Sequence, residues 1–465
     1  MRGGKCRFRC RSGSLRGTSR RDMDDGVLIV GGGLTGLSTA LHLPASVQWQ
    51  LFEKDARPGG HARTELRDGF YFDKTGHWLH LRDPGIMALV DELFPGDRAS
   101  HSLTKVARKA RIFSSGVLSR YPFQANLFGL PPSVISECLL GFIEAQSDPR
   151  SMEPAQNFAD FCDKRFGKGI SRHFMLPYNR KLWGVDPSEI TAAWCSRFVP
   201  IPKLADVVKG AVGDTPPELG YNAHFLYPRE GGIETLVHRI VDRLPQDRLH
   251  KGAALESVEL ATKTAIVGGE RHHFSAMVAT LPLPELCRRI VDLPSHLQPF
   301  VDALRCTPVR YLNVATKVPP RSDYHWLYVP EDKYPFYRIG VYSNAVPSMA
   351  PSGCGSFYVE LSSRGPIDEA KLVPEVLDSL VAAGVLHRKE DLLFADLREI
   401  EYAYVVFDDN YYPALAALVP FLEQHGIYPR GRYGSWTYNS MEDCLMLGRD
   451  IAAQLTNPSG LLKKK

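Results

Sequence analysis

The segment "GFYFDKTGHWLHLRD", residues 69–83, brings two histidines, two aspartates and an arginine together. Such groups serve as metal ligands or as general acids and bases. His77 and His80 are spaced as a ligand pair, but no convincing third or fourth ligand accompanies them, so no metal site is predicted. His80 and Asp83 are expected in a loop or at a helix start, and Asp73 in a cap or local pair. The segment should therefore line a site whose reagent is a bound molecule.

A glycine turn in "VLIVGGGLTGLSTALHL" predicts what is bound. The pattern reads as a strand, a turn and a helix, and its glycines fit G-x-G-x-x-G. Residues without a Cβ let a pyrophosphate approach the backbone, and the following helix directs its positive N-terminus at that charge. The residues expected around the pyrophosphate are Gly31, Gly33, Leu34, Thr35 and Gly36.

An acidic residue ends the next predicted strand, "VQWQLFEKD". Glu53 follows Gly33 by about 20 residues, the spacing at which a carboxylate meets the ribose hydroxyls of a dinucleotide. The loop beyond it, "KDARPGGHARTE", resembles the second signature of the flavoproteins that include amine oxidases, protoporphyrinogen oxidases and sugar-nucleotide mutases. The resemblance favours FAD over NAD, with further cofactor contacts expected at Lys54, Gly59, Gly60 and His61.

Charge and cysteine content narrow the class of protein. Residues 1–22 hold seven arginines, one lysine and one aspartate, which leaves the remainder near −3 although the whole chain carries +4. No general basicity favours nucleic acid. The leader, residues 1–23, lacks the apolar core of a secretory signal and is expected to be disordered or non-native. Its Arg-rich, acid-poor composition leaves an organellar transit peptide open as the alternative. Nine scattered cysteines favour reduced thiols and a cytoplasmic location, and no run approaches the ~18 apolar residues of a membrane span.

The elements that position these residues predict an α/β fold. Residues 24–85, 220–300 and 400–460 are expected to form a discontinuous, Rossmann-like FAD-binding domain. Helical patterns such as "PPSVISECLLGFIEA" predict an inserted helical domain over 86–219 that caps the substrate. Alternating patterns such as "RYLNVATKV" and "GSFYVELSS" predict an antiparallel substrate-binding sheet over 301–399.

Four further motifs, rich in aromatic and arginine residues, resemble one family. They are "YPFQANLFGLP", "FMLPYNRKLWGVDP", "WLYVPEDKYPFYRIGVYSN" and "YPRGRYGSWTYN". Together they resemble the UDP-galactopyranose mutases, especially the larger eukaryotic-type members, over almost all of residues 25–455. The residue types suit a nucleotide sugar, because guanidinium groups bind phosphate oxygens in pairs and aromatic faces pack on uracil and sugar rings.

The resemblance assigns roles to individual positions. Uridine would be held by Tyr121, Phe123 and Gln124, and the nucleotide and sugar sites lined by Asn179 and Trp183. The diphosphate would meet Arg197, Arg338, Tyr328, Tyr412 and Tyr438, with Asn222 on a substrate loop. The flavin would be contacted by Gly76, His77, Arg432 and the backbone N–H of Met441. The residues implied in catalysis are Arg197, Arg338 and His77, the last as a flavin-loop group and not as a general base.

Two departures from the family pattern are visible. Thr75 stands where a glycine is usual in the loop that carries His77. The chain also lacks the long insertions with which some eukaryotic members form higher oligomers, which leaves monomer and dimer both open.

The family scheme implies an isomerase. Reduced flavin attacks the anomeric carbon through N5 and expels UDP, the sugar opens from the flavin adduct and recloses as a furanose, and UDP returns without net redox change. The implied substrate is a UDP-galactose-type nucleotide sugar, and the implied flavin reductant is NAD(P)H.

Three alternatives stay open. A mutase acting on a different nucleotide sugar would share the chemistry. An FAD-dependent oxidoreductase of the amine oxidase or protoporphyrinogen oxidase class would share the FAD domain but use an apolar substrate tunnel. The third alternative is a non-catalytic flavin- or nucleotide-binding protein.

Overall fold

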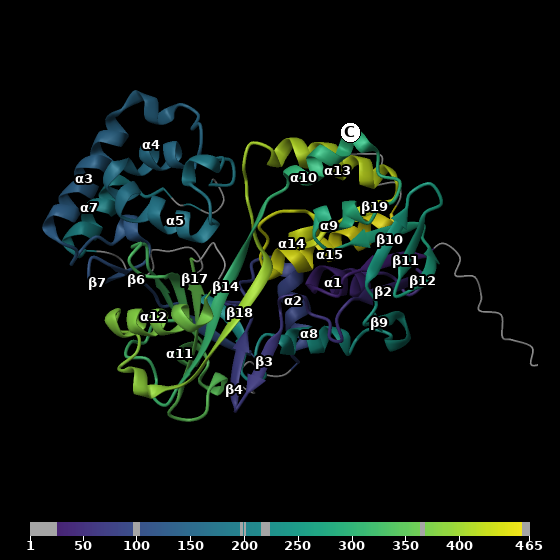
Figure 1. Cartoon of the computed structure of the whole chain (residues 1–465), viewed down its shortest axis with the longest axis horizontal. Helices are drawn as coiled ribbons and strands as arrows, with labels where there is room; N and C mark the ends of the chain where they lie inside the picture. Colours follow the sequence, from purple (N-terminus) through teal and green to yellow (C-terminus); the bar gives the residue numbers. More distant parts are fainter. Residues whose placement is uncertain are drawn as a thin grey trace, which may run out of the picture.

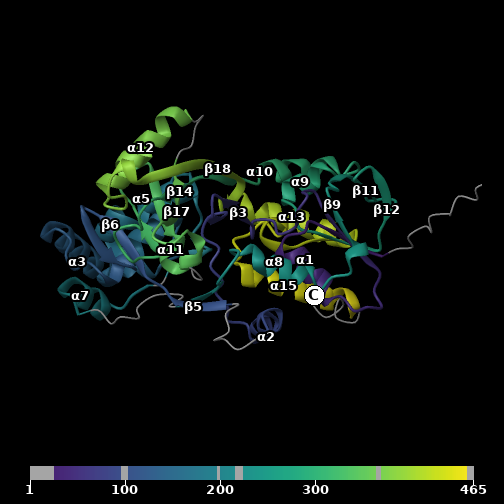
Figure 2. The ribbon, with the colours of Figure 1, turned by 90° about the horizontal axis from the view of Figure 1, so that it is seen from below.

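Two sheets organise the chain. The computed structural model describes residues 26–95, 103–195, 199, 201–214, 224–362 and 368–457. A parallel five-stranded sheet with its helices forms one end of the molecule, and a group of helices forms the other (Figure 1). A seven-stranded sheet lies between them, as the second view also shows (Figure 2).

The parallel sheet contains the strand that precedes the glycine turn. Its order is β19 (Ile427–Pro429), β13 (Ala276–Ala279), β1 (Val27–Val30), β2 (Trp49–Glu53) and β9 (Leu249–Lys251), and all neighbours are parallel. Every residue of β1 and β13 is buried, as expected for parallel strands covered on both faces. The covering helices include α1 (Leu34–His42), α8 (Glu234–Val241), α9 (Leu283–Arg288) and α15 (Met441–Thr456). This confirms the predicted Rossmann-like fold.

Smaller elements complete this end of the molecule. The strands β10 (Leu255–Glu259), β11 (Thr264–Val267) and β12 (Glu270–His273) form an antiparallel sheet. The helices α10 (Gln298–Ala303), α13 (Tyr411–Gln424) and α14 (Gly431–Gly434) lie near β19 and α9. The hairpin β3 (Thr64–Arg67) and β4 (Phe70–Asp73) leads toward the seven-stranded sheet.

The seven-stranded sheet has two chemically different faces. Its order is β18 (Leu392–Val405), β14 (Cys306–Thr316), β17 (Gly355–Leu361), β16 (Phe336–Val341), β15 (Trp326–Tyr328), β6 (Ala110–Ser114) and β7 (Val117–Arg120). One face carries apolar residues such as Leu312, Ile339 and Val359, which pack against α12 (Glu369–Ala382). Since successive side chains alternate, the other face carries Arg338, Glu360 and their neighbours. The sheet is antiparallel except where β15 pairs with β6.

The helical end consists mainly of α3 (Pro132–Ser147), α4 (Phe158–Ile170), α5 (Leu176–Trp183) and α7 (Leu204–Val212). The last turn of α5 ends at Gly184, which adopts a left-handed C-cap conformation. Across the described residues, no helix has both the length and the apolar character needed to cross a membrane.

The predicted boundary of the helical domain, 86–219, was too wide at its start. Residues 84–93 form α2 (Pro84–Leu93), which packs against α8 and α15 of the nucleotide-binding end. Residues 103–120 form β5 (Leu103–Ala107), β6 and β7, and not helices. The turn Ser115–Gly116, with both φ angles positive, closes β6 and β7 into a hairpin, whose strands are too short for a clear alternating pattern. β5 pairs instead with β8 (His224–Pro228).

Candidate active site

The glycine turn between β1 and α1 places residues without side chains at the N-terminus of α1. Gly31 has a φ of 104°, in the region that favours glycine. A Cβ on Gly36 would lie 2.0 Å from the Gly31 carbonyl oxygen. Gly33 is the N-cap of α1 and offers no capping side chain, so the first-turn N–H groups stay available to an anion. Leu34 and Gly60 flank this turn, and a Cβ on Gly60 would lie 3.3 Å from the Gly33 Cα.

The carboxylate of Glu53 is held beside the turn. Its Oε2 accepts from the Gly32 N–H at 2.7 Å and its Oε1 from the Asp55 N–H at 2.9 Å. The Gly59 N–H donates to the Gly32 carbonyl at 2.7 Å, which joins the two loops. Lys54 is exposed next to Glu53. These contacts fix the acid at the end of β2, where the ribose of a dinucleotide is expected.

The side chain of Thr35 contacts the helix α15. Its Oγ1 donates to the Cys444 carbonyl of α15 at 3.0 Å. The side chain therefore ties α15 to α1, and the cofactor contact of Thr35 stays a prediction.

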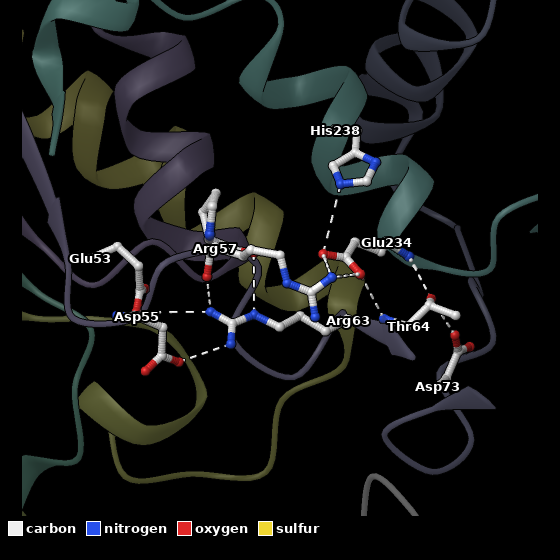
Figure 3. A network of polar contacts seen from close by, with 9 residues as sticks. Glu53, Asp55, Arg57, Arg63, Thr64, Asp73, Glu234 and His238 are labelled. Carbon is white, nitrogen blue, oxygen red and sulfur yellow. Dashed lines mark hydrogen bonds and ion pairs between the residues drawn. The ribbon is translucent and has the colours of Figure 1, made fainter. Parts of the chain in front are cut away.

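A polar network supports the second loop (Figure 3). Arg63 donates to the Asp55 carboxylate at 2.8 Å and to the Pro58 carbonyl at 3.3 Å. The Thr64 N–H donates to Glu234 Oε2 at 3.0 Å, and the Glu234 N–H donates to Thr64 Oγ1 at 3.1 Å. This exchange fixes the start of α8 against β3.

Asp73 continues this network at the end of β4 (Figure 3). Its Oδ1 accepts from Thr64 Oγ1 at 2.7 Å and its Oδ2 from the Tyr227 hydroxyl at 2.5 Å. The Ile233 N–H also donates to Oδ1, at 3.2 Å. Burial raises the pKa of Asp73 to about 7 despite these three donors. Asp73 thus anchors the start of the loop that carries His77.

The loop that carries His77 packs against the aromatic side chains of Tyr342 and Tyr358. The Tyr342 hydroxyl lies 2.9 Å from the Asp73 carbonyl oxygen and 3.0 Å from that of Thr75. Thr75 has a φ of 63°, an uncommon conformation for a β-branched residue, and this explains why a glycine suits the position in the related family. A Cβ on Gly76 would lie 2.2 Å from the Tyr358 hydroxyl oxygen, so the predicted Gly76 has room for no side chain.

His77 fits a flavin-loop role. Burial, and then the nearby charge of Arg432, lower the pKa of His77 to about 4, so the ring is neutral at pH 7. Its Nδ1 is buried and has no hydrogen-bond partner within the described part of the chain. A buried polar atom without a partner is costly, and a ligand atom can satisfy it.

Arg432 lies among aromatic rings at the end of the parallel sheet. Its guanidinium donates to the Asn439 carbonyl at 2.8 Å and to the Ala403 carbonyl at 2.9 Å, and lies 4.3 Å from the centre of the Tyr438 ring. The neighbouring Tyr433 hydroxyl is 3.1 Å from His61 Nδ1, and burial holds the pKa of His61 well below its usual value. The predicted His61, Arg432 and Tyr438 therefore meet in one place.

Met441 is the first residue of α15. The preceding Ser440 caps the helix by accepting from the Asp443 N–H at 3.1 Å. The N–H of a first helical residue has no partner inside the helix, so that of Met441 can serve a ligand as predicted.

Arg338 is the charged centre of the polar face of the seven-stranded sheet. Its guanidinium donates to Glu360 at 2.6 Å and to the Tyr404 hydroxyl at 2.9 Å. The Arg338 side chain is only 18% exposed and Glu360 is fully buried, so the arginine does not point into bulk solvent. Arg338 Nε and Glu360 Oε2 are buried without partners among the described residues.

An aromatic wall with a second arginine stands beside it. Tyr121 and Tyr328 stack with ring centres 5.0 Å apart. Arg108 donates to the Tyr328 hydroxyl at 2.9 Å and lies 5.0 Å from the Tyr121 ring and 4.5 Å from the Trp326 ring. Tyr328 pairs with Arg338 across β15 and β16, so the two predicted phosphate residues are neighbours.

Most residues predicted around uridine and sugar are buried in the helical end of the molecule. Phe123 is fully buried and stacks on Phe174 at 5.1 Å, and Gln124 is also buried. Asn179 accepts from Trp183 Nε1 at 3.2 Å and donates to the carbonyl of Met175, the N-cap of α5, at 2.8 Å. The Trp183 ring meets the Tyr404 ring edge to face, 5.6 Å apart, which places α5 against the Arg338 cluster.

One described position, Tyr412, is not brought into this cluster. Tyr412 is 48% exposed on α13, with its ring against Tyr411. Arg197 and Asn222 lie outside the described residues.

Sequence reasoning missed Arg108, Glu360 and Tyr404. Arg108 sits in the basic run "TKVARKAR", which is typical of a solvated surface. Glu360 was detectable as a lone acid inside the apolar strand "GSFYVELSS", since a buried charge needs a partner. Tyr404, near the end of β18, carried no local signal.

The class of protein follows from fold and family together. The chain matches the model of the flavin-containing amine oxidoreductase family over residues 34–454, and it belongs to that family. The glycine cradle, Glu53 and the unpartnered His77 Nδ1 fit the cofactor of this class, which is FAD.

Solved structures of two enzymes have folds similar to that of this chain. The fold is similar to that of a reduced UDP-galactopyranose mutase, with a TM-score of 0.87, 26% identity, and coverage of 95% of this chain and 96% of that one. A cyclohexylamine oxidase from Brevibacterium oxydans IH-35A shares the fold at a TM-score of 0.64 and 16% identity, covering 94% and 100% of the two chains.

Among curated proteins, the coproporphyrinogen III oxidases of Mycobacterium bovis and Mycobacterium tuberculosis are 27% identical over 278 residues. That alignment spans 56% of this chain and only 60% of theirs.

Proposed function

We propose that the chain is a flavin-dependent UDP-galactopyranose mutase, which interconverts UDP-galactopyranose and UDP-galactofuranose without net redox change. The observation that carries this proposal is the Arg338 cluster, a guanidinium with one unpartnered nitrogen beside two tyrosines, on a fold similar to that of such a mutase. A diphosphate is the chemistry that this set of donors recognises.

Each residue of the cluster has a defined task in this reaction. Arg338 and Tyr328 bind the diphosphate, and Arg108 adds positive charge from the other side of the Tyr328 hydroxyl. Positive charge near the departing diphosphate stabilises the developing negative charge when the glycosidic bond breaks. Because UDP must return to the same sugar, the same contacts keep it in the site.

The flavin side has a separate set of tasks. FAD, when bound in its reduced state, supplies the electron-rich ring that the sugar carbon needs. Neutral His77 can accept or donate a hydrogen bond through Nδ1 without adding charge. Arg432 on α14 and the Met441 N–H at the start of the neighbouring α15 would orient the cofactor.

A product assay tests the proposal. The purified holoprotein is reduced with dithionite, or with NADPH as the proposed biological donor, and offered UDP-galactofuranose. Chromatography should show UDP-galactopyranose only with reduced flavin. UDP-glucose and other nucleotide sugars, offered in parallel, define the sugar. Absence of turnover with every nucleotide sugar would overturn the proposal.

Arg338→Ala sharpens this test. Loss of one charged contact to a leaving group costs about 2–4 kcal/mol of transition-state stabilisation, so kcat/KM should fall by about 30- to 1000-fold with flavin retained. Arg310→Ala is the matched control, because Arg310 also pairs with a glutamate on this sheet but lies on the opposite face. Full activity of Arg338→Ala would remove the diphosphate assignment.

A second candidate is an oxidase, which the coproporphyrinogen III oxidase relatives favour. It predicts oxygen consumption with a porphyrinogen or an amine and no isomerisation of a nucleotide sugar. The same holoprotein, oxidised and assayed in an oxygen electrode with coproporphyrinogen, distinguishes the two.

A further inference from the structure

Lys181 is a buried lysine surrounded by backbone carbonyl groups. The residue is only 6% exposed, and its Nζ donates to four carbonyl oxygens, those of Val329 at 3.2 Å, Glu331 at 2.8 Å, Tyr334 at 2.9 Å and Phe336 at 2.7 Å. An ammonium has three N–H groups, so every donor is used and one is shared.

All four acceptors belong to one short segment. Residues 329–335 connect β15 to β16, and Phe336 is the first residue of β16. These strands carry Tyr328 and Arg338 at directly paired positions. The conformation of this connection therefore sets where the two proposed diphosphate residues stand. Lys181 is the one described side chain that reaches these four carbonyl groups.

Lys181 itself lies on α5, between Asn179 and Trp183. That helix is anchored independently, because Thr307 of β14 donates to the Trp183 carbonyl at 2.5 Å and fills the space in front of Gly184. One ammonium thus joins a fixed helix on the proposed nucleotide side to the hairpin on the diphosphate side.

Burial of the charged Lys181 ammonium carries a desolvation cost. Burial lowers the pKa of its ammonium to about 8, although Asp332 and Glu331 act in the opposite direction. A methionine or leucine would fill the same space without this cost, but would leave the four carbonyl oxygens without a donor.

We propose that Lys181 is a positioning residue for the diphosphate site, and that the four carbonyl groups form a cation site which an ammonium ion can occupy when the lysine side chain is removed. The inference rests on the proposed function, because UDP is the ligand whose binding it controls.

Truncation followed by rescue tests this inference. In Lys181→Ala the affinity for UDP, measured by fluorescence or calorimetry, should fall at least about tenfold, as expected for lost hydrogen bonds to a charged group. The flavin content should stay that of the wild type, and KM should rise more than kcat falls. Ammonium or ethylammonium chloride should restore UDP affinity, and tetramethylammonium chloride, which has no N–H, should not.

Two further variants keep the outcome decisive. Lys209→Ala removes an exposed lysine on α7 and should change neither UDP affinity nor its response to ammonium. Lys181→Met keeps the apolar stem, so it reports on the lost donors even if the alanine variant does not fold; its UDP affinity should fall while flavin is retained. Unchanged UDP affinity in the folded variants, or loss of flavin and UDP binding together without rescue, would overturn the inference.

Failure of the proposed function looks different. If the wild type neither binds UDP nor isomerises UDP-galactose, the proposed function is wrong. If the wild type does both and the Lys181 variants bind UDP equally well, only the role of Lys181 is wrong.

Discussion

At the scale of single residues, Gly76 has no room for a side chain in the loop that carries His77. A Cβ there would lie 2.2 Å from the Tyr358 hydroxyl oxygen and 3.1 Å from Trp326 Nε1, and these two groups are hydrogen-bonded to each other at 2.7 Å. Gly76→Ala should therefore displace the His77 loop and release flavin. The ratio of flavin absorbance to protein in the purified variant measures this.

The variant Gly384→Ala is a control that introduces backbone strain without a steric clash of the new Cβ. Gly384 has a φ of 70° and open space where a Cβ would stand, so Gly384→Ala should cost only about 1 kcal/mol of stability and keep its flavin. Equal flavin content in the two variants would contradict the packing of the loop against Tyr358.

Asp73 should make stability depend on pH. Its pKa is about 7 in the folded chain, whereas the ordinary value is 3.8. The folded state keeps a proton that the unfolded chain releases above about pH 4. The contribution of Asp73 to stability is therefore full below pH 4 and is lost as the pH rises to about 7.

Asp73→Asn removes this titration while keeping the size of the side chain. Between pH 4 and 7, the free energy of unfolding of the wild type should fall by roughly 4 kcal/mol relative to the variant. Urea unfolding at several pH values measures the difference. Parallel pH profiles of the two proteins would show that Asp73 ionises normally.

At the scale of elements, the contact between α1 and α15 aligns the phosphate-binding turn with the helix that starts at Met441. A Cβ on Gly448 would lie 2.5 Å from Ser38 Cβ and 2.6 Å from the Thr35 carbonyl oxygen. Gly448→Ala should push the helices apart, lower stability by about 1–3 kcal/mol and weaken flavin binding. Thermal unfolding and flavin retention measure both effects, and the exposed change Ala453→Ser on α15 should alter neither.

The elements also show why some of the site was predictable and some was not. The glycine turn, Glu53 and α1 were predictable because their signals are local and closely spaced in sequence. The hairpin of β6 and β7 was not, since its strands are short and are completed only by pairing with β15. Tyr404 and Glu360 meet Arg338 across three strands, and no spacing within one segment predicts such a meeting.

The residues assigned by family resemblance also differ in whether the structure brings them together. Tyr328 and Arg338 stand side by side because the register of β15 and β16 pairs them. Tyr411 and Tyr412 are adjacent in sequence, but helical geometry buries the first and exposes the second. The motif could not distinguish them, and the diphosphate contact of Tyr412 stays a prediction.

At the scale of the whole molecule, the proposed site is shared between two sheets, one parallel and one mainly antiparallel. The parallel sheet supplies the glycine turn, and the seven-stranded sheet supplies Arg338 and Tyr328. The long strand β18 joins them, because the Ala403 carbonyl binds Arg432 and the next residue, Tyr404, binds Arg338. Ligand bound at one sheet should therefore stabilise the whole chain.

UDP should reveal this as a shift of the unfolding temperature. A ligand at 100 times its Kd that binds only the folded state adds about 2.7 kcal/mol to the free energy of unfolding. Wild-type holoprotein should therefore unfold a few degrees higher with UDP than without, and Arg338→Ala should show a much smaller shift at the same concentration. Uridine, which lacks the diphosphate, is the matched ligand and should stabilise neither protein strongly. An equal shift from UDP in both proteins would place diphosphate binding away from Arg338.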